Sequence, residues 1–197
     1  MCAEKRLRLF VAADIPPLVR EAVSSALEPL KEKVPGGRWV RPENLHITLK
    51  FIGEYGEERL ERLSNEITAA AARCAPFTVR LGKCGAFPSR TRARVLWVGM
   101  TEGEEEAAAV AGKLDVRLEK AGVKREGRDY RGHLTVARLR EPFDCSAFLV
   151  ELAANMERVD SMAFEVGELT LYRSILSPSG PTYVALRVFS LGGDGGG

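Results

Sequence analysis

The chain has 197 residues, a formal net charge of +2 and 45% hydrophobic residues, which is typical of a soluble protein large enough for one sizeable domain. A charge so close to zero does not demand a nucleic-acid partner, although it does not repel a polyanion either. No apolar run reaches the ~18 residues of a membrane helix, and the first ten residues lack the apolar core of a secretory signal. We therefore expect a cytoplasmic protein without a membrane partner.

The spacing of cysteine, histidine and acidic residues in the sequence does not indicate a metal or cofactor site. The chain has four cysteines and two histidines, and their spacing matches no zinc motif. No carboxylate cluster flanks either histidine, so a two-metal mechanism is not indicated. We expect no metal and no cofactor.

The first half of the chain predicts strands alternating with helices. A β-rich apolar stretch at 6–15 predicts a strand, and Pro16 and Pro17 suit the first turn of a helix whose apolar residues recur at helical spacing up to Leu30. Pro29 is expected to kink or end that helix. Further elements are predicted as a strand at 46–52, a helix at 60–74 and a strand at 77–87.

The second half repeats this order. It predicts a strand at 94–100, a helix at 104–121, a strand at 133–139 and a helix at 148–156 that Asp144 can cap. Two more strands follow at 163–176 and 182–191, separated by the turn sequence SPSGP. The last six residues, 192–197 with the sequence GGDGGG, are expected to be disordered.

Both histidines fall in the same four-residue pattern, H-[ILV]-T-[ILV]. His46 lies in HITL and His133 lies in HLTV, 87 positions apart. Together with the repeated order of elements, this indicates an internal duplication with repeats at roughly 6–84 and 94–191. Antiparallel strands with helices packed outside them correspond to an α+β fold class.

The pattern itself suggests acid–base chemistry. Alternation along a strand places His46 and Thr48 on one face, and His133 and Thr135 likewise, with aliphatic residues behind them. A single such motif is more often an ordinary half-buried strand, but two facing imidazoles can act as a general acid and a general base. In-line attack on a phosphodiester suits such a pair, with the threonine hydroxyls donating to phosphate oxygens.

These motifs and the stretches around them resemble the 2H phosphoesterase superfamily, and within it the RNA 2′,3′-cyclic phosphodiesterases, also called 2′-5′ RNA ligases. The resemblance spans about residues 6–191 and includes RLFVAADIP, ENLHITLKFIGE, RVLWVGM, HLTVARL and ELTLYRSILSPSGPTYVAL. It implies a single bilobal domain over residues 1–191, with a pseudo-twofold axis and two antiparallel sheets facing a central cleft.

The same resemblance implies metal-independent opening of a 2′,3′-cyclic phosphate at an RNA end, leaving a 2′-phosphate. His46 would be the proton donor, His133 the proton acceptor, and Thr48 and Thr135 would hold the phosphate. The residues by themselves leave the roles of the two histidines interchangeable. The substrate would be an RNA end or a small cyclic nucleotide, and a monomer is expected because both half-sites lie in one chain.

Two positions near the second motif, Gly132 and Arg138, bear on how it is placed and what it binds. Gly132 stands where the family commonly has proline before the histidine, which leaves the start of that strand less constrained. Arg138 matches the family's usual arginine and could contact phosphate or the RNA backbone. Strict alternation nevertheless places Arg138 on the face opposite His133, unless a bulge redirects it.

Two other functions remain open. The same cleft could hold a nucleotide or an RNA end without turnover, although binding alone does not require two titrating groups. Alternatively, the physiological reaction could be 2′-5′ ligation, the reverse direction.

Overall fold

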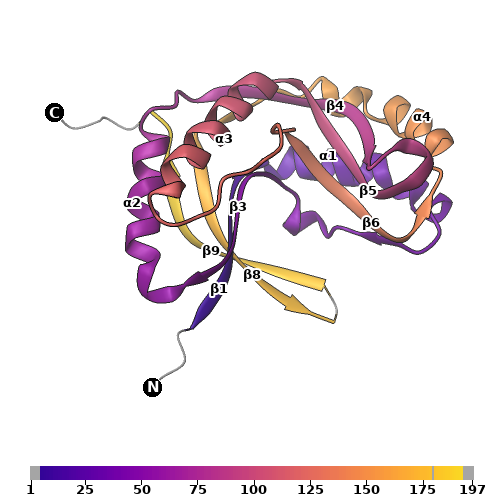
Figure 1. Cartoon of the computed structure of the whole chain (residues 1–197). Coiled ribbons are helices and arrows are strands. Elements are labelled where there is room, and N and C mark those ends of the chain that lie inside the picture. The colour runs from indigo at the N-terminus through magenta and orange to yellow at the C-terminus, as the bar shows by residue number, and fades with distance from the viewer. Residues whose placement is uncertain (1–4, 179, 193–197) are drawn as a thin grey trace.

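The computed structural model describes residues 5–178 and 180–192, and its strands form one strongly curled antiparallel sheet (Figure 1). The α+β class predicted from the sequence is confirmed. Apart from Gly192, the predicted disordered tail lies outside the described residues. The strands are β1 (Arg6–Asp14), β2 (Gly37–Trp39), β3 (His46–Gly56), β4 (Phe77–Phe87), β5 (Ala93–Glu102), β6 (His133–Phe143), β7 (Phe164–Val166), β8 (Glu168–Ser177) and β9 (Gly180–Ser190).

The order of strands across the sheet is β7-β4-β5-β6-β3-β1-β8-β9, with β2 paired to the free side of β6 near its middle. The two sheets expected from the sequence are thus joined into one path, through a single residue pair, Ile47 with Leu134. We call the group β3-β1-β8-β9 the His46 lobe and the group β7-β4-β5-β6 with β2 the His133 lobe. Each lobe takes strands from both halves of the sequence.

The helices are also exchanged between the halves. Helix α2 (Leu60–Ala71) and helix α3 (Glu104–Glu119) lie together against the His46 lobe, whereas α1 (Pro17–Leu27), α4 (Ser146–Asn155) and the short α5 (Glu157–Asp160) cover the His133 lobe (Figure 1). Short 3-10 turns complete the chain: Glu28–Lys33, Pro42–Asn44, Glu57–Arg59 and Arg90–Arg92. The chain therefore crosses between the lobes repeatedly, for example after β1 and after β5, which interlocks them.

Most element predictions are confirmed, and the differences have local causes. Pro29 does end the helical run, since Glu28–Lys33 continues only as a 3-10 turn. Gly82 marks a bulge in β4, as its neighbours lose register with β5 there, whereas Gly85 is paired normally. The Asp144 carboxylate accepts the Ser146 N–H at 3.0 Å, one residue before the position that caps α4. The short strand β2 was not predicted, because three residues carry too little pattern.

Candidate active site

The two motif histidines open the two strands that join the lobes. His46 is the first residue of β3 and His133 is the first residue of β6. The paired residues Ile47 and Leu134 follow directly, and they are 1% and 0% exposed in the core. Both imidazoles and the following Thr48 and Thr135 are half-buried on the concave face. The structure therefore brings together the two sites that the sequence separates by 87 residues.

Each imidazole is fixed through the same nitrogen. His46 Nδ1 lies 2.7 Å from the carbonyl oxygen of Asn44, and His133 Nδ1 lies 2.7 Å from the carbonyl oxygen of Arg131. A carbonyl only accepts, so Nδ1 carries the proton in both rings. This leaves both Nε2 atoms for chemistry, where one can take a proton and the other can deliver one.

Thr48 contacts the free nitrogen of its own motif. Its Oγ1 lies 3.1 Å from His46 Nε2, and in the neutral ring the hydroxyl is the donor. Thr135 occupies the corresponding place on β6, opposite Trp97 of β5. Both hydroxyls thus sit beside the imidazoles on the face where the sequence pattern placed them.

A bulge follows each motif and changes which residues reach the site. In β6 the pairing with β5 passes from Thr135 directly to Ala137, and both Val136 and Ala137 are buried. Alternation is thereby reversed, so Arg138 lies on the face of His133 and Thr135. Strict alternation therefore does not hold here, because the bulge that the sequence left open as an exception is present.

The same bulge occurs after the first motif, with different consequences. The pairing of β3 with β1 passes from Thr48 to Lys50, and Leu49 and Lys50 are both buried. The position equivalent to Arg138 is therefore Phe51, which is 55% exposed. One lobe presents a guanidinium to the site where the other presents a phenyl ring.

Burial and charge lower the pKa of both histidines. For His46, burial lowers the pKa most; the Asn44 carbonyl and the Asp14 carboxylate raise it, and the charges of Arg138 and His133 lower it. For His133, burial again lowers the pKa most, the Arg131 carbonyl raises it, and Arg138 lowers it. The Arg138 guanidinium thus acts on both rings, and His46 has a carboxylate that His133 lacks.

Asp14 was not identified from the sequence, and it distinguishes the two histidines. It lies opposite His46 in the β1–β3 ladder, and the equivalent position opposite His133 is Gly99. The carboxylate accepts hydrogen bonds from Thr170 Oγ1 at 2.8 Å and Tyr172 Oη at 2.7 Å. Only the cross-strand register reveals this partner, because Asp14 and His46 lie far apart in sequence.

Aromatic rings enclose both imidazoles. Phe10 stacks on His46 with ring centroids 4.8 Å apart, and Tyr183 meets His46 edge-on at 5.1 Å. On the other side, Phe87 meets His133 edge-on at 5.1 Å and Trp97 lies at 6.2 Å. The rings restrict imidazole rotation and provide the burial that lowers both pKa values.

Tyr130 ties the segment before the second motif to the first motif. Its hydroxyl donates to the carbonyl oxygen of Thr48 at 3.1 Å. The same segment is held by Lys50, which donates to the carbonyl of Lys124 at 2.9 Å and pairs with Asp115 at 2.6 Å. Burial raises the pKa of Tyr130 well above its ordinary value, so it remains a donor. The Tyr130 bond thus connects the segment before β6 to β3, where the ladder between the lobes has one residue pair.

Gly132 lets the chain approach the core immediately before His133. A Cβ atom there would lie 2.4 Å from Met100 Cε, and Met100 is fully buried. A residue with a Cβ atom at this position would therefore require the end of the Met100 side chain to move.

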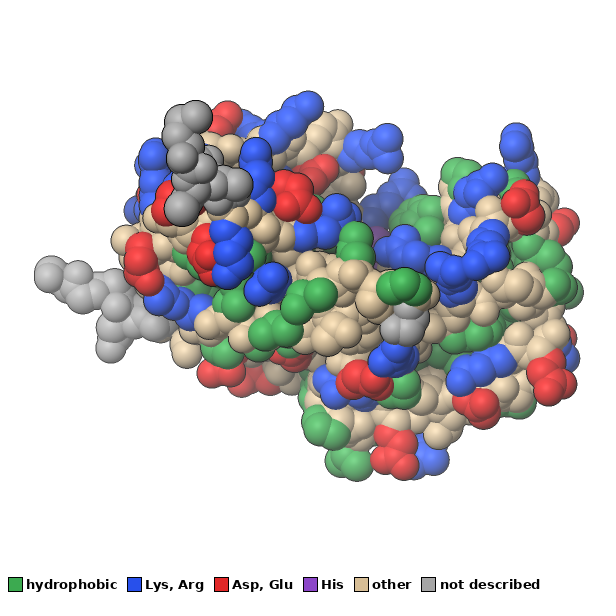
Figure 2. Space-filling model, turned by 90° about the horizontal axis from the view of Figure 1, so that it is seen from below, with side chains coloured by type: hydrophobic (Ala, Val, Ile, Leu, Met, Phe, Trp, Pro, Cys, Tyr) green, Lys and Arg blue, Asp and Glu red, His purple; other side chains and the backbone are tan. Residues whose placement is uncertain are grey.

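Each histidine also borders its own hollow. One of about 340 Å³ lies beside His46 and is lined by Asp14, Arg20, Glu43, Leu45, Tyr172, Tyr183 and Ala185. A smaller one of about 160 Å³ lies beside His133 and is lined by Lys83, Phe87, Trp97, Gly99, Met100, Glu104, Arg131 and Gly132. Figure 2 shows Lys and Arg side chains gathered around the hollow between the two parts of the molecule. The two hollows are lined by side chains of both signs of charge: Asp14, Arg20 and Glu43 beside His46, and Lys83, Glu104 and Arg131 beside His133.

Metal binding and membrane spanning were considered for residues 5–178 and 180–192. In this part of the chain, no three His, Cys, Asp or Glu side chains are grouped so that they could hold a metal ion. None of the helices described there has the length and apolarity needed to cross a membrane.

The chain belongs to the LigT like Phosphoesterase family, which matches residues 14–97 and again 98–183. The fold, the paired motifs and this match define it as a phosphoesterase of the two-histidine class. Two curated relatives carry the name RNA 2′,3′-cyclic phosphodiesterase. The protein of Archaeoglobus fulgidus is 39% identical over 93% of this chain and 99% of its own length, and that of Methanothermobacter thermautotrophicus is 36% identical over 94% and 100%.

Solved structures of related proteins share this fold. A protein of Thermus thermophilus superposes with a TM-score of 0.77 at 30% identity, covering 95% of this chain and 100% of that one. Escherichia coli LigT, solved in complex with NADP+, superposes with a TM-score of 0.70 at 27% identity, covering 95% and 98%. LigT has also been solved in complex with 3′-AMP.

Proposed function

We propose that this protein hydrolyses 2′,3′-cyclic phosphate ends of RNA to 2′-phosphomonoesters, using His46 and His133 as a general acid and base without a metal. The observation that carries the proposal is the matched anchoring of the two rings, each with Nδ1 on a backbone carbonyl, which keeps Nε2 free of the backbone. The printed names of the relatives support the RNA substrate.

In this mechanism His133 Nε2 removes a proton from water, and the water oxygen attacks phosphorus. The bond from phosphorus to the 3′ oxygen breaks, and His46 Nε2 delivers its proton to that oxygen. The phosphate remains on the 2′ oxygen. Thr48, Thr135 and Arg138 stabilise the charge that develops on the non-bridging oxygens.

Asp14 supports the assignment of roles. A general acid must be protonated when substrate binds, and the Asp14 carboxylate raises the pKa of His46. His133 has Gly99 in the equivalent place, so no carboxylate opposes the effect of Arg138 on it. In this assignment the Asp14 carboxylate favours the protonated form of His46, the acid, and His133, which has no such carboxylate, is the base.

The test is turnover of an oligonucleotide ending in a 2′,3′-cyclic phosphate, with EDTA present. His46→Ala and His133→Ala should each lower kcat/KM at least ~10²-fold, as expected for loss of acid–base catalysis. Loss of turnover on chelation would exclude the metal-free mechanism. Full activity in both variants would exclude the two histidines as the general acid and base.

Two alternatives are decided by related measurements. Stoichiometric tight binding of the cyclic end with no product would make the protein a binding module. Net joining of a 5′-hydroxyl RNA to a cyclic end, at physiological end concentrations, would make 2′-5′ ligation the working direction.

A further inference from the structure

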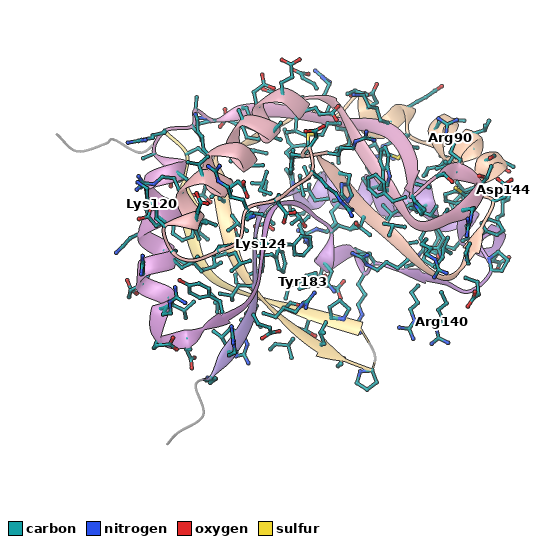
Figure 3. All side chains as sticks on the ribbon, viewed as in Figure 1. Arg90, Lys120, Lys124, Arg140, Asp144 and Tyr183 are labelled. Atoms are coloured by element: carbon teal, nitrogen blue, oxygen red, sulfur yellow. The ribbon has the colours of Figure 1, made fainter. Side chains whose placement is uncertain are left out.

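Three arginines form a row that continues from the site along β6. Arg138 and Arg140 follow the bulge on β6, and their spacing of two residues places both on the concave face with His133. Arg38 on β2 pairs directly with Arg138 in the antiparallel ladder, so its side chain shares that face. All three are exposed, and Figure 3 shows Arg140 extending toward the open side on which Tyr183 also lies.

The arrangement is unfavourable without an anion. Side chains directly opposite each other in a ladder have Cβ atoms about 5 Å apart, where like charges repel. Within the described ranges, none of the three guanidinium groups has a carboxylate partner within salt-bridge distance. Some other arginines do have one: Arg80 pairs with Glu102, and Arg187 pairs with Glu61.

The row is also long enough to follow several nucleotides of a single strand of nucleic acid. From His133 to Arg140 the strand rises roughly 20 Å, so the row begins at the reacting phosphate and leads away from it. Proteins that hold single strands use basic grooves that follow the backbone. Aromatic rings beside the histidines, such as Tyr183, can stack on the terminal base or ribose.

We propose that Arg38, Arg138 and Arg140 bind the backbone phosphates of the RNA on the 5′ side of the cyclic end. This rests on the proposed function and names its substrate class: the preferred substrate is an oligonucleotide end rather than a cyclic mononucleotide. Arg138 serves both the reacting phosphate and the next one, whereas Arg38 and Arg140 serve only the upstream chain.

The first test compares two substrates. The kcat/KM for a hexanucleotide ending in a cyclic phosphate is divided by that for the matching 2′,3′-cyclic mononucleotide. Arg38→Gln and Arg140→Gln should each lower this ratio roughly fivefold. Arg158→Gln is the matched control: it removes the same charge from an exposed position on α5, on the helical side of the same lobe.

The second test does not need turnover. Anisotropy of a fluorescent hexanucleotide ending in a 2′-phosphate gives the affinity between about 50 and 200 mM salt. Each removed arginine should reduce the slope of log affinity against log salt by about 0.7. Arg38→Lys keeps the charge and should keep the slope, which separates loss of charge from a folding defect.

The proposal is overturned if Arg38→Gln and Arg140→Gln behave like Arg158→Gln in both the ratio and the salt slope. If the unmodified protein hydrolyses neither substrate, the proposed function fails, and the salt slopes alone then decide whether the row binds RNA.

Discussion

The two halves of the site share their backbone geometry but carry different side chains at equivalent positions. Both present an imidazole held by a carbonyl two residues earlier, at 2.7 Å, and both have a bulge at the same place after the threonine. They differ at two equivalent positions: Asp14 against Gly99, and Phe51 against Arg138. The shared features fix Nδ1 of each ring on a backbone carbonyl. In the proposed mechanism the differences distinguish the ring that gives a proton from the ring that takes it.

The largest expected effect separates the two histidines by leaving group. On the cyclic phosphate, both alanine variants should lose at least ~10²-fold in kcat/KM. On a phosphodiester with p-nitrophenol as leaving group, which departs without a proton, His46→Ala should lose far less, whereas His133→Ala should still lose at least ~10²-fold. Initial rates of both variants on both substrates test this, and equal losses on the activated diester would exclude distinct roles.

Replacing Arg138 should have the next largest effect. Arg138→Gln removes a charge-assisted contact to phosphate, so kcat/KM should fall about tenfold or more. Because the guanidinium lowers the pKa of both histidines, both limbs of the pH profile should move to higher pH in the variant. Phe51→Gln, at the equivalent position of the other lobe, is the control and should leave both limbs in place.

Asp14→Asn tests which ring is the acid. Removing the carboxylate lowers the pKa of His46, so His46 loses its proton at lower pH. If His46 is the acid, the alkaline limb of kcat/KM against pH moves to lower pH and the acid limb stays. Movement of the acid limb instead would assign His46 as the base. Tyr172→Phe removes a hydrogen bond but keeps the carboxylate, and should shift the alkaline limb much less.

Tyr130→Phe should weaken the connection between the halves. The lost bond to the Thr48 carbonyl is expected to cost about 1 kcal/mol of stability. If Tyr130 sets the separation of the two motifs, kcat should fall several-fold with KM nearly unchanged. Denaturant unfolding and steady-state kinetics measure the two effects. A loss of stability without any change in kcat would limit Tyr130 to a structural role.

The smallest effect concerns the arginine row. Arg38→Gln removes a like charge opposite Arg138, so the protein without RNA should gain about 0.2–1 kcal/mol in free energy of unfolding. Urea unfolding at low salt measures this, with Arg158→Gln as reference. A loss of stability would mean that Arg38 has a structural partner instead of repelling Arg138.

The sequence alone determined most of the elements and the pairing of each histidine with its threonine. Period-two alternation in HITL and HLTV is a local property, so it correctly placed His46 with Thr48 and His133 with Thr135 on one face each. The helical spacing after Pro17 and the stop at Pro29 are local too, and the structure has both. The two motifs could be recognised as related because the same four-residue pattern surrounds both histidines of the chain.

Only the tertiary structure decided which residues join that pair. The bulge that turns Arg138 toward the site exists because Val136 has no partner on β5, and such pairing depends on a strand far away in sequence. Asp14 beside His46, Arg38 beside Arg138 and Tyr130 against Thr48 are likewise cross-strand or cross-lobe neighbours. Alternation fixes the face of a side chain within its own strand, whereas register between strands fixes its neighbours, and register is set by packing of the whole sheet.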